Sequence, residues 1–171
     1  MNMTEVPFEI LQLQKKRKLA HYVILATVLT TAINLLLLFT HINFYLPYDA
    51  SLAYYLTFLG YFFDGYSLGT YTVTGLVMAL AVLGVWLVVW WMARTRWIWL
   101  IIGIVLTAVD TVFLLLFSLV FLQGLSGSLI PILLHGAVIV TIGMGLKAHN
   151  QLEAWAAQPP EAPETLEEIP T

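Results

Sequence analysis

The chain has 171 residues, of which 60% are hydrophobic and only 10% are charged, with a net charge of −3 and no cysteine. A soluble globular domain has about 25% charged residues, so this composition is typical of an integral membrane protein. The absence of cysteine excludes disulfides, thiolate metal sites and thiol redox chemistry.

Four apolar stretches, each about long enough to cross a bilayer as a helix, predict an all-α four-helix bundle in a membrane. Residues 1–18 are expected to be a cytoplasmic segment, either frayed or forming a short amphipathic helix. The spans are expected over 19–40, 70–92, 97–122 and 129–147, with the first retained as a signal anchor. Residues 149–171 contain four prolines among five acids and are expected to be a disordered cytoplasmic tail.

The basic residues predict the topology of the bundle. Four of the seven lie at positions 15–18, before the first span; Arg94 and Arg96 separate the second and third; Lys147 closes the fourth. All seven therefore fall on one side, and since cytoplasmic segments retain positive charge, both termini are expected to be cytoplasmic. The cluster at 15–18 would also attract anionic lipid, and no further basic arm for nucleic acid is present.

The outer loop, residues 41–69, is rich in aromatic side chains and holds only two charges, Asp49 and Asp64. Asp49 or Ser51 could cap a short helix that ends at about Phe63. Its apolar face would consist of Leu52, Tyr55, Leu56, Leu59 and Phe63.

Two roles for this helix stay open. It could be an element that packs at the outer membrane interface, or a lid over the mouth of the bundle. As a lid, it would contact a ligand or partner through four aromatic side chains: Tyr54, Tyr55, Phe58 and Phe62.

A polar layer is predicted inside the membrane. Asp110 lies about 13 residues into the third span, roughly 20 Å deep at 1.5 Å per residue, and an ionisable residue at such depth is a functional candidate by default. His135 in the fourth span, Asn34 in the first and Thr74 in the second fall at a similar height, and Thr107 shares the helix face of Asp110.

Three interpretations of this layer remain. Asp110 and His135, helped by Asn34, could lock the helices together. They could instead form a proton or ion relay that titrates as one unit. Alternatively, the layer could bind a small molecule or a lipid headgroup beneath the aromatic loop.

The sequence gives less support to an enzymatic function or to a bound cofactor. The sequence has no nucleophile elbow, P-loop or HExxH motif, and one Asp with one His completes neither a metal site nor an acid–base set. The histidines do not pair at matched depths as a b-type haem requires. No metal or cofactor is therefore expected.

The runs TAINLLLL at 31–38 and ASLAYYLTFLG at 50–60, together with Asp110, resemble a group of small four-span proteins common in Gram-positive bacteria. The resemblance extends over roughly residues 15–148. This group has no assigned activity, so the resemblance implies a fold and a bacterial plasma membrane location, and nothing about chemistry.

The sequence thus favours a non-enzymatic accessory or binding protein of the membrane. It would engage a lipid, a hydrophobic ligand or a partner membrane protein, including a second copy, through the outer loop and the polar layer. The alternative is a transporter or proton-coupled subunit that uses Asp110 and His135.

Overall fold

The computed structural model describes residues 7–40, 42, 44–121 and 126–158, and these residues contain helices and no strand. The elements are α1 (Phe8–Phe39), α2 (Ser51–Phe63), α3 (Thr70–Met92), α4 (Ile98–Phe121), the 3-10 turn η1 (Ser126–Ser128) and α5 (Leu129–Ala156). Four of them, α1, α3, α4 and α5, are long and apolar enough to cross a membrane. The predicted all-α class with four spanning helices is therefore confirmed.

Two helices are longer than hydropathy predicts. α1 begins at Phe8, so residues 8–18 continue the first span as one helix. α5 continues to Ala156, because the residues after Lys147 are mostly good helix formers and His149 Nε2 lies 3.2 Å from the carboxylate of Glu153, one turn later. The tail expected to be disordered from residue 149 is thus helical as far as Ala156, and its part from 159 to 171 lies outside the described residues.

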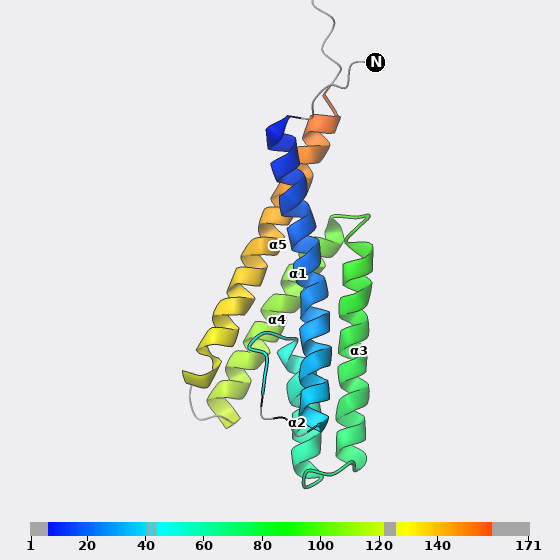
Figure 1. The fold of residues 1–171 in the computed structure, drawn as a ribbon, viewed down its shortest axis with the longest axis vertical. Helices are drawn as coiled ribbons and strands as arrows, with labels where there is room; N and C mark the ends of the chain where they lie inside the picture. Colours follow the sequence, from blue (N-terminus) through cyan, green and yellow to red (C-terminus); the bar gives the residue numbers. More distant parts are fainter. Residues whose placement is uncertain (1–6, 41, 43, 122–125, 159–171) are drawn as a thin grey trace, which may run out of the picture.

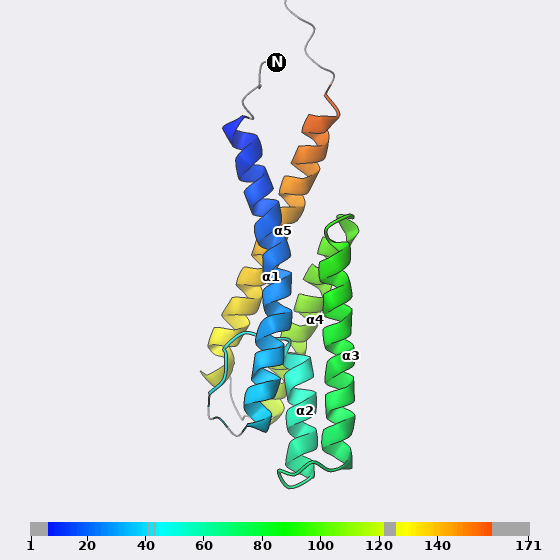
Figure 2. The ribbon, with the colours of Figure 1, turned by 45° about the vertical axis from the view of Figure 1, so that its right-hand side comes forward.

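The helices form an elongated bundle in which α1 and α5 extend beyond the turn between α3 and α4 (Figure 1). Toward the chain termini α1 and α5 diverge (Figure 2). They approach each other closely where Gly145 meets Ala20, because a Cβ on Gly145 would collide with the Cβ of Ala20. Small residues at such a crossing allow two membrane helices to pack closely.

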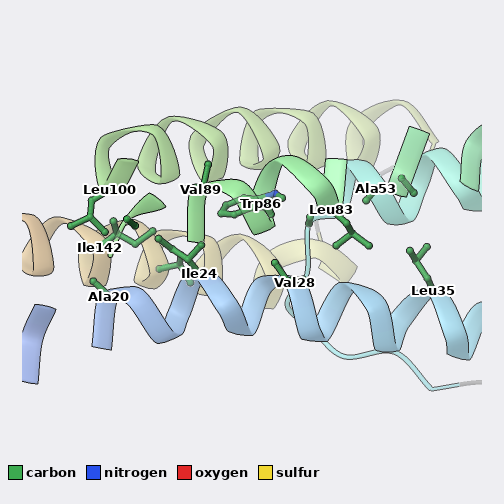
Figure 3. Close-up of a cluster of buried hydrophobic side chains, with 14 residues drawn as sticks. Ala20, Ile24, Val28, Leu35, Ala53, Leu83, Trp86, Val89, Leu100 and Ile142 are labelled. Atoms are coloured by element: carbon green, nitrogen blue, oxygen red, sulfur yellow. The ribbon is translucent and has the colours of Figure 1, made fainter. Parts of the chain in front are cut away.

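The buried core runs along the bundle axis (Figure 3). Ile24 of α1 and Ile142 of α5 are fully buried, and α3 and α4 contribute Val89 and Leu100. The outward faces of the same helices remain apolar and exposed, for example at Leu80, Val109, Leu133 and Val140. Helices that are apolar on all sides are expected where the surroundings are lipid.

α2 is a short helix placed beside α3, in the half of the bundle far from the termini (Figures 1 and 2). The connection after α1 turns back along the bundle as far as Ala50, which is completely buried. α2 therefore begins at the level of Asp110, in the middle of α4, and runs outward to Phe63. The helix predicted for these residues is confirmed, and its N-terminus lies among the other helices.

Glycines set the contact between α2 and α3. A Cβ on Gly75 of α3 would lie 2.5 Å from the carbonyl oxygen of Leu56, and a Cβ on Gly60 of α2 would collide with the carbonyl oxygen of Tyr71. The buried face of α2 consists mainly of small residues, Ser51, Ala53, Thr57 and Gly60. The apolar face predicted for this helix, Leu52, Tyr55, Leu56, Leu59 and Phe63, is half-buried or exposed, so it is not the face that packs into the bundle. Small residues form the packed face because close backbone approach governs packing between membrane helices.

Candidate functional site

Asp110 caps the N-terminus of α2 from a different helix. One carboxylate oxygen accepts the backbone N–H of Ser51 at 2.8 Å, and the other accepts that of Leu52 at 2.8 Å. The first N–H groups of any helix lack partners within the helix, and a carboxylate there also interacts favourably with the helix dipole. Neither Asp49 nor Ser51 caps α2 with its side chain, so the capping group lies 59 residues later than the helix start.

His135 of α5 completes this arrangement. Its Nε2 lies 2.8 Å from Oδ2 of Asp110, and its Nδ1 lies 2.8 Å from the carbonyl oxygen of Pro131. A carbonyl only accepts, so Nδ1 carries a proton. Nε2 then shares one further proton with the carboxylate, and the pair is neutral overall whichever group holds it. Both side chains are buried, with exposures of 5% for Asp110 and 1% for His135.

A second carboxylate, Asp49, holds the connection between α1 and α2. Asn34 Nδ2 donates to Asp49 Oδ2 at 2.8 Å and to the carbonyl of Leu46 at 3.0 Å, while Asn34 Oδ1 accepts the N–H of Leu46 at 2.8 Å. The hydroxyl of Tyr45 donates to Asp49 Oδ1 at 3.0 Å. The amide of Asn34 thus replaces the backbone partners that an irregular segment would otherwise lack.

Threonines of α1 also form hydrogen bonds that hold this connection. The N–H of Ala50 donates to the hydroxyl of Thr31 at 2.7 Å. The hydroxyls of Tyr48 and Thr27 lie 2.7 Å apart, and the ring of Tyr48 packs edge-on against His135 with centroids 5.1 Å apart. The connection is therefore held by α1 on one side and by the Asp110–His135 pair on the other.

The predicted polar layer is only partly assembled. Asp110 and His135 are in direct contact, and Asn34 binds the connection instead of Asp110. Thr107 is buried and donates to the carbonyl of Gly103, within its own helix. Thr74 is exposed and donates to the carbonyl of Thr70, so it does not join the layer.

Residues of the connection complete the layer and were not predicted as site residues: Tyr45, Tyr48 and Asp49. Asp49 offered a signal, since it is one of two charges in an aromatic segment. The other, Asp64, accepts the N–H of Thr72 at 2.6 Å at the start of α3, and this bond lowers the pKa of Asp64. Both loop carboxylates thus satisfy polar groups of the fold.

Aromatic side chains of α2 line an open hollow of about 200 Å³. The lining residues, called the aromatic hollow below, are Tyr45, Tyr54, Tyr55, Phe58 and Phe117. Tyr55 stacks on Phe117 of α4 with centroids 4.0 Å apart, and Tyr54 stacks on Phe58. Three of the four aromatic residues predicted as contacts therefore share this hollow. The fourth, Phe62, is 51% exposed and packs against Phe63 and Tyr66.

The titration of Asp49 predicts a pH-dependent stability. Burial raises the pKa of Asp49 from 3.8 to about 6, against the opposing hydrogen bonds from Asn34 and Tyr45. The folded chain then keeps a proton that the unfolded chain has lost, so stability falls as the pH rises from about 4 through 6. Thermal unfolding in detergent should show the protein more stable at pH 5 than at pH 7.5 by about 1 kcal/mol.

The matched variant for this measurement is Asp49→Asn, which keeps an acceptor oxygen for Asn34 and removes the charge. Its stability should change less between the two pH values than that of the wild type. An unchanged pH dependence in Asp49→Asn would assign the effect to another group.

The polar atoms of Asp110 and His135 are all engaged in holding the helices. Both oxygens of Asp110 already accept backbone N–H groups, and His135 uses both ring nitrogens. Among the described residues, no group of three or more His, Asp or Glu side chains is placed to hold a metal ion. Comparison with protein-family models, with curated proteins and with solved structures finds no match to the chain.

Proposed function

We propose that this protein is a non-enzymatic binding protein of the bacterial plasma membrane. Its aromatic hollow would take an apolar group of a lipid, a hydrophobic ligand or a partner membrane protein. The observation that carries the proposal is the hollow itself, in which aromatic side chains from α2, α4 and the connection converge around about 200 Å³. Aromatic residues provide large contact areas and dominate the energetics of many binding surfaces.

The size of the hollow indicates what it would accept. Pockets for whole drug-sized ligands measure about 300–1,000 Å³, so 200 Å³ suits a ring or a few methylene groups of a larger molecule. An acyl chain or an apolar side chain of a partner helix meets this description. The polar groups that line the hollow are tyrosine hydroxyls, which suit an occupant that is mainly apolar.

The polar layer would support binding by positioning α2. Its N-terminus is fastened by Asp110, and the connection before it by Asn34 and Thr31. A binding surface that is already ordered loses less conformational entropy when its partner arrives. In this proposal the layer of Asp110 and His135 prepares the binding surface and does not contact the ligand.

We also propose that both termini face the cytoplasm. Arg17 Nη2 donates to the carbonyl of Arg94 at 3.1 Å, so basic residues of α1 and of the α3–α4 turn gather at one end of the bundle. Positive charge is retained on the cytoplasmic side of membrane proteins. The aromatic end with α2 would then lie on the outer side.

The proton-coupled alternative has one feature in its favour, the single proton shared by Asp110 and His135. However, a relay needs a next group that accepts this proton. The second nitrogen of His135 is engaged by the carbonyl of Pro131, and both oxygens of Asp110 hold α2. A binding role therefore explains more of the geometry.

Removal of two aromatic rings from the hollow tests the proposal. A photoactivatable fatty acid with a diazirine near its chain end should label α2 of the wild-type protein in membranes. The variant with Tyr54→Ala and Phe58→Ala should be labelled there roughly tenfold less, because such anchors each contribute more than about 1 kcal/mol. Tyr55 is kept because its stacking on Phe117 supports packing between α2 and α4.

The control is Phe63→Ala, which removes an aromatic ring from α2 outside the hollow. Labelling of this variant should match the wild type. Equal labelling of all three proteins would count against an acyl group in the hollow. Co-purification of a partner membrane protein that is lost only in the double variant would assign the hollow to that partner.

A further inference from the structure

At the opposite end of the molecule, α1 and α5 diverge beside the α3–α4 turn (Figure 2). Residues of these three parts of the chain line a larger cleft. Its volume is about 520 Å³. We call it the terminal cleft, and the residues of its lining that matter here are Arg17, Lys18, His21, Tyr22, Arg94 and Trp155. The proposed function above makes no use of it.

Among the described residues, the charges that line the terminal cleft are all positive. Arg17, Lys18 and Arg94 contribute three cations, and no described Asp or Glu lines the cleft. Two of these cations are held in place. Arg17 donates to the carbonyl of Arg94 at 3.1 Å, and the guanidinium of Arg94 lies 4.2 Å from the centre of the Trp90 ring. The cleft is therefore prepared for an anion before any ligand arrives.

His21 adds an unused donor to the same lining. Nε of Arg94 donates to Nε2 of His21 at 3.1 Å, so the proton of the neutral imidazole lies on Nδ1. Nδ1 is buried and has no hydrogen-bond partner among the described residues. An N–H group without a partner is unfavourable in a buried position, and a small rotation of the imidazole that exposes Nδ1 to the cleft would let an acceptor oxygen of a ligand relieve this.

Apart from Gln14, the rest of the described lining is apolar or aromatic. Ile10 and Leu152 form part of the walls, and Tyr22 and Trp155 lie beside them. Tyr and Trp are enriched where membrane helices meet the headgroup region. A cleft with cations, an apolar wall and interfacial aromatics, at the end of spanning helices, suits an anion attached to a hydrophobic body.

We propose that the terminal cleft binds the phosphate headgroup of an anionic membrane phospholipid. The phosphate would lie among Arg17, Lys18 and Arg94, and the glycerol and upper acyl chains would contact the apolar wall. Basic pockets between membrane helices are known to bind such headgroups. Charge complementarity and the apolar wall together favour a lipid over a free phosphate ion, which would gain nothing from the wall.

The test measures binding of phosphatidylglycerol and of phosphatidylcholine to the full-length protein in detergent, by native mass spectrometry during lipid titration. The wild type should bind phosphatidylglycerol more tightly than phosphatidylcholine. Lys18→Glu should weaken phosphatidylglycerol binding roughly tenfold or more, because each nearby basic residue contributes about a fivefold factor. Lys18 is exposed, so this variant should fold.

Two matched controls separate the cleft from general surface charge. Lys15→Glu makes the same charge change at an exposed position of α1 that does not line the cleft, and its affinity should stay near the wild-type value. Ala156→Trp narrows the cleft without changing its charge and should also weaken binding. Ala157→Trp, at the neighbouring position outside the lining, should leave lipid binding unchanged.

Several results would overturn the proposal. Equal weakening by Lys18→Glu and Lys15→Glu would indicate an unspecific electrostatic effect. Displacement of the lipid by an equal concentration of inorganic phosphate would indicate a site for the free ion. Binding seen only after truncation at Gln158 would mean that the acidic residues beyond it compete for the cleft of the full chain.

Discussion

Replacement of Asp110 by Ala is expected to lower the free energy of unfolding by about 3–5 kcal/mol, the usual cost of removing one partner from a buried ion pair. The substitution would leave the N–H groups of Ser51 and Leu52 without an acceptor and His135 without its Nε2 partner. Unfolding in mixed detergent micelles would measure the loss. Faster hydrogen exchange at the backbone amides of Ser51 and Leu52 would show that the N-terminus of α2 is no longer held in place.

The control for this substitution is Thr111→Val, one position further along α4, which removes a hydroxyl that donates to the carbonyl of Thr107 within the same helix. This variant should leave exchange in α2 unchanged. If Asp110→Ala also left the two amides as protected as in the wild type, the carboxylate would not be the group that fastens α2. A double-mutant cycle with His135→Ala would then separate the two partners.

Gly75→Ala is expected to destabilise the bundle by about 3 kcal/mol, at the upper end of the usual cost of overpacking. The new methyl group would lie 2.5 Å from the carbonyl oxygen of Leu56 and 3.1 Å from Cα of Thr57. Both are backbone atoms, so no side-chain rotation can make room and α2 must move away from α3. The change should appear in the unfolding midpoint and as lower exchange protection along α2.

Gly84→Ala, on the same helix, is expected to have the opposite effect on stability. A Cβ at Gly84 meets no atom within 4 Å, and alanine is favoured over glycine in a helix by about 1 kcal/mol. This variant should therefore be slightly more stable than the wild type. If both substitutions destabilised the protein equally, helix propensity and flexibility, and not the close contact with Leu56, would explain the loss at Gly75.

The long helices could be predicted from the sequence because each span needs about 20 apolar residues. The bounds of α2, from Ser51 to Phe63, were also close to those predicted from the local sequence, although the expected caps, Asp49 and Ser51, do not cap the helix. The similar height of Asp110 and His135 followed from the fixed rise per residue in a helix, whereas their direct contact also depends on how the two helices face each other. These features depend on local sequence or on simple geometry.

Neither the path of the connection between α1 and α2 nor the rotation of α3 about its own axis could be predicted in this way. The connection is buried by hydrogen bonds to Asn34, Thr31 and Asp110, and none of these lies within ten residues of its partner in the chain. Thr74 was expected in the polar layer at the correct height, but the neighbouring Gly75 faces α2 and turns Thr74 outward. The rotation of a helix about its axis depends on close packing with a partner that hydropathy does not reveal.

The cap that Asp110 places on α2 also imposes an order on assembly. α2 and α3 follow each other in the chain and can pair as soon as both are synthesised, but the group that completes the N-terminus of α2 arrives 59 residues after its first residue. Contacts between distant residues form late because the intervening chain must first be ordered. Asn34 and Thr31 of α1 precede the connection and can hold it early, whereas the N-terminus of α2 gains its carboxylate cap only once α4 has joined, and Asp110 gains His135 only with α5.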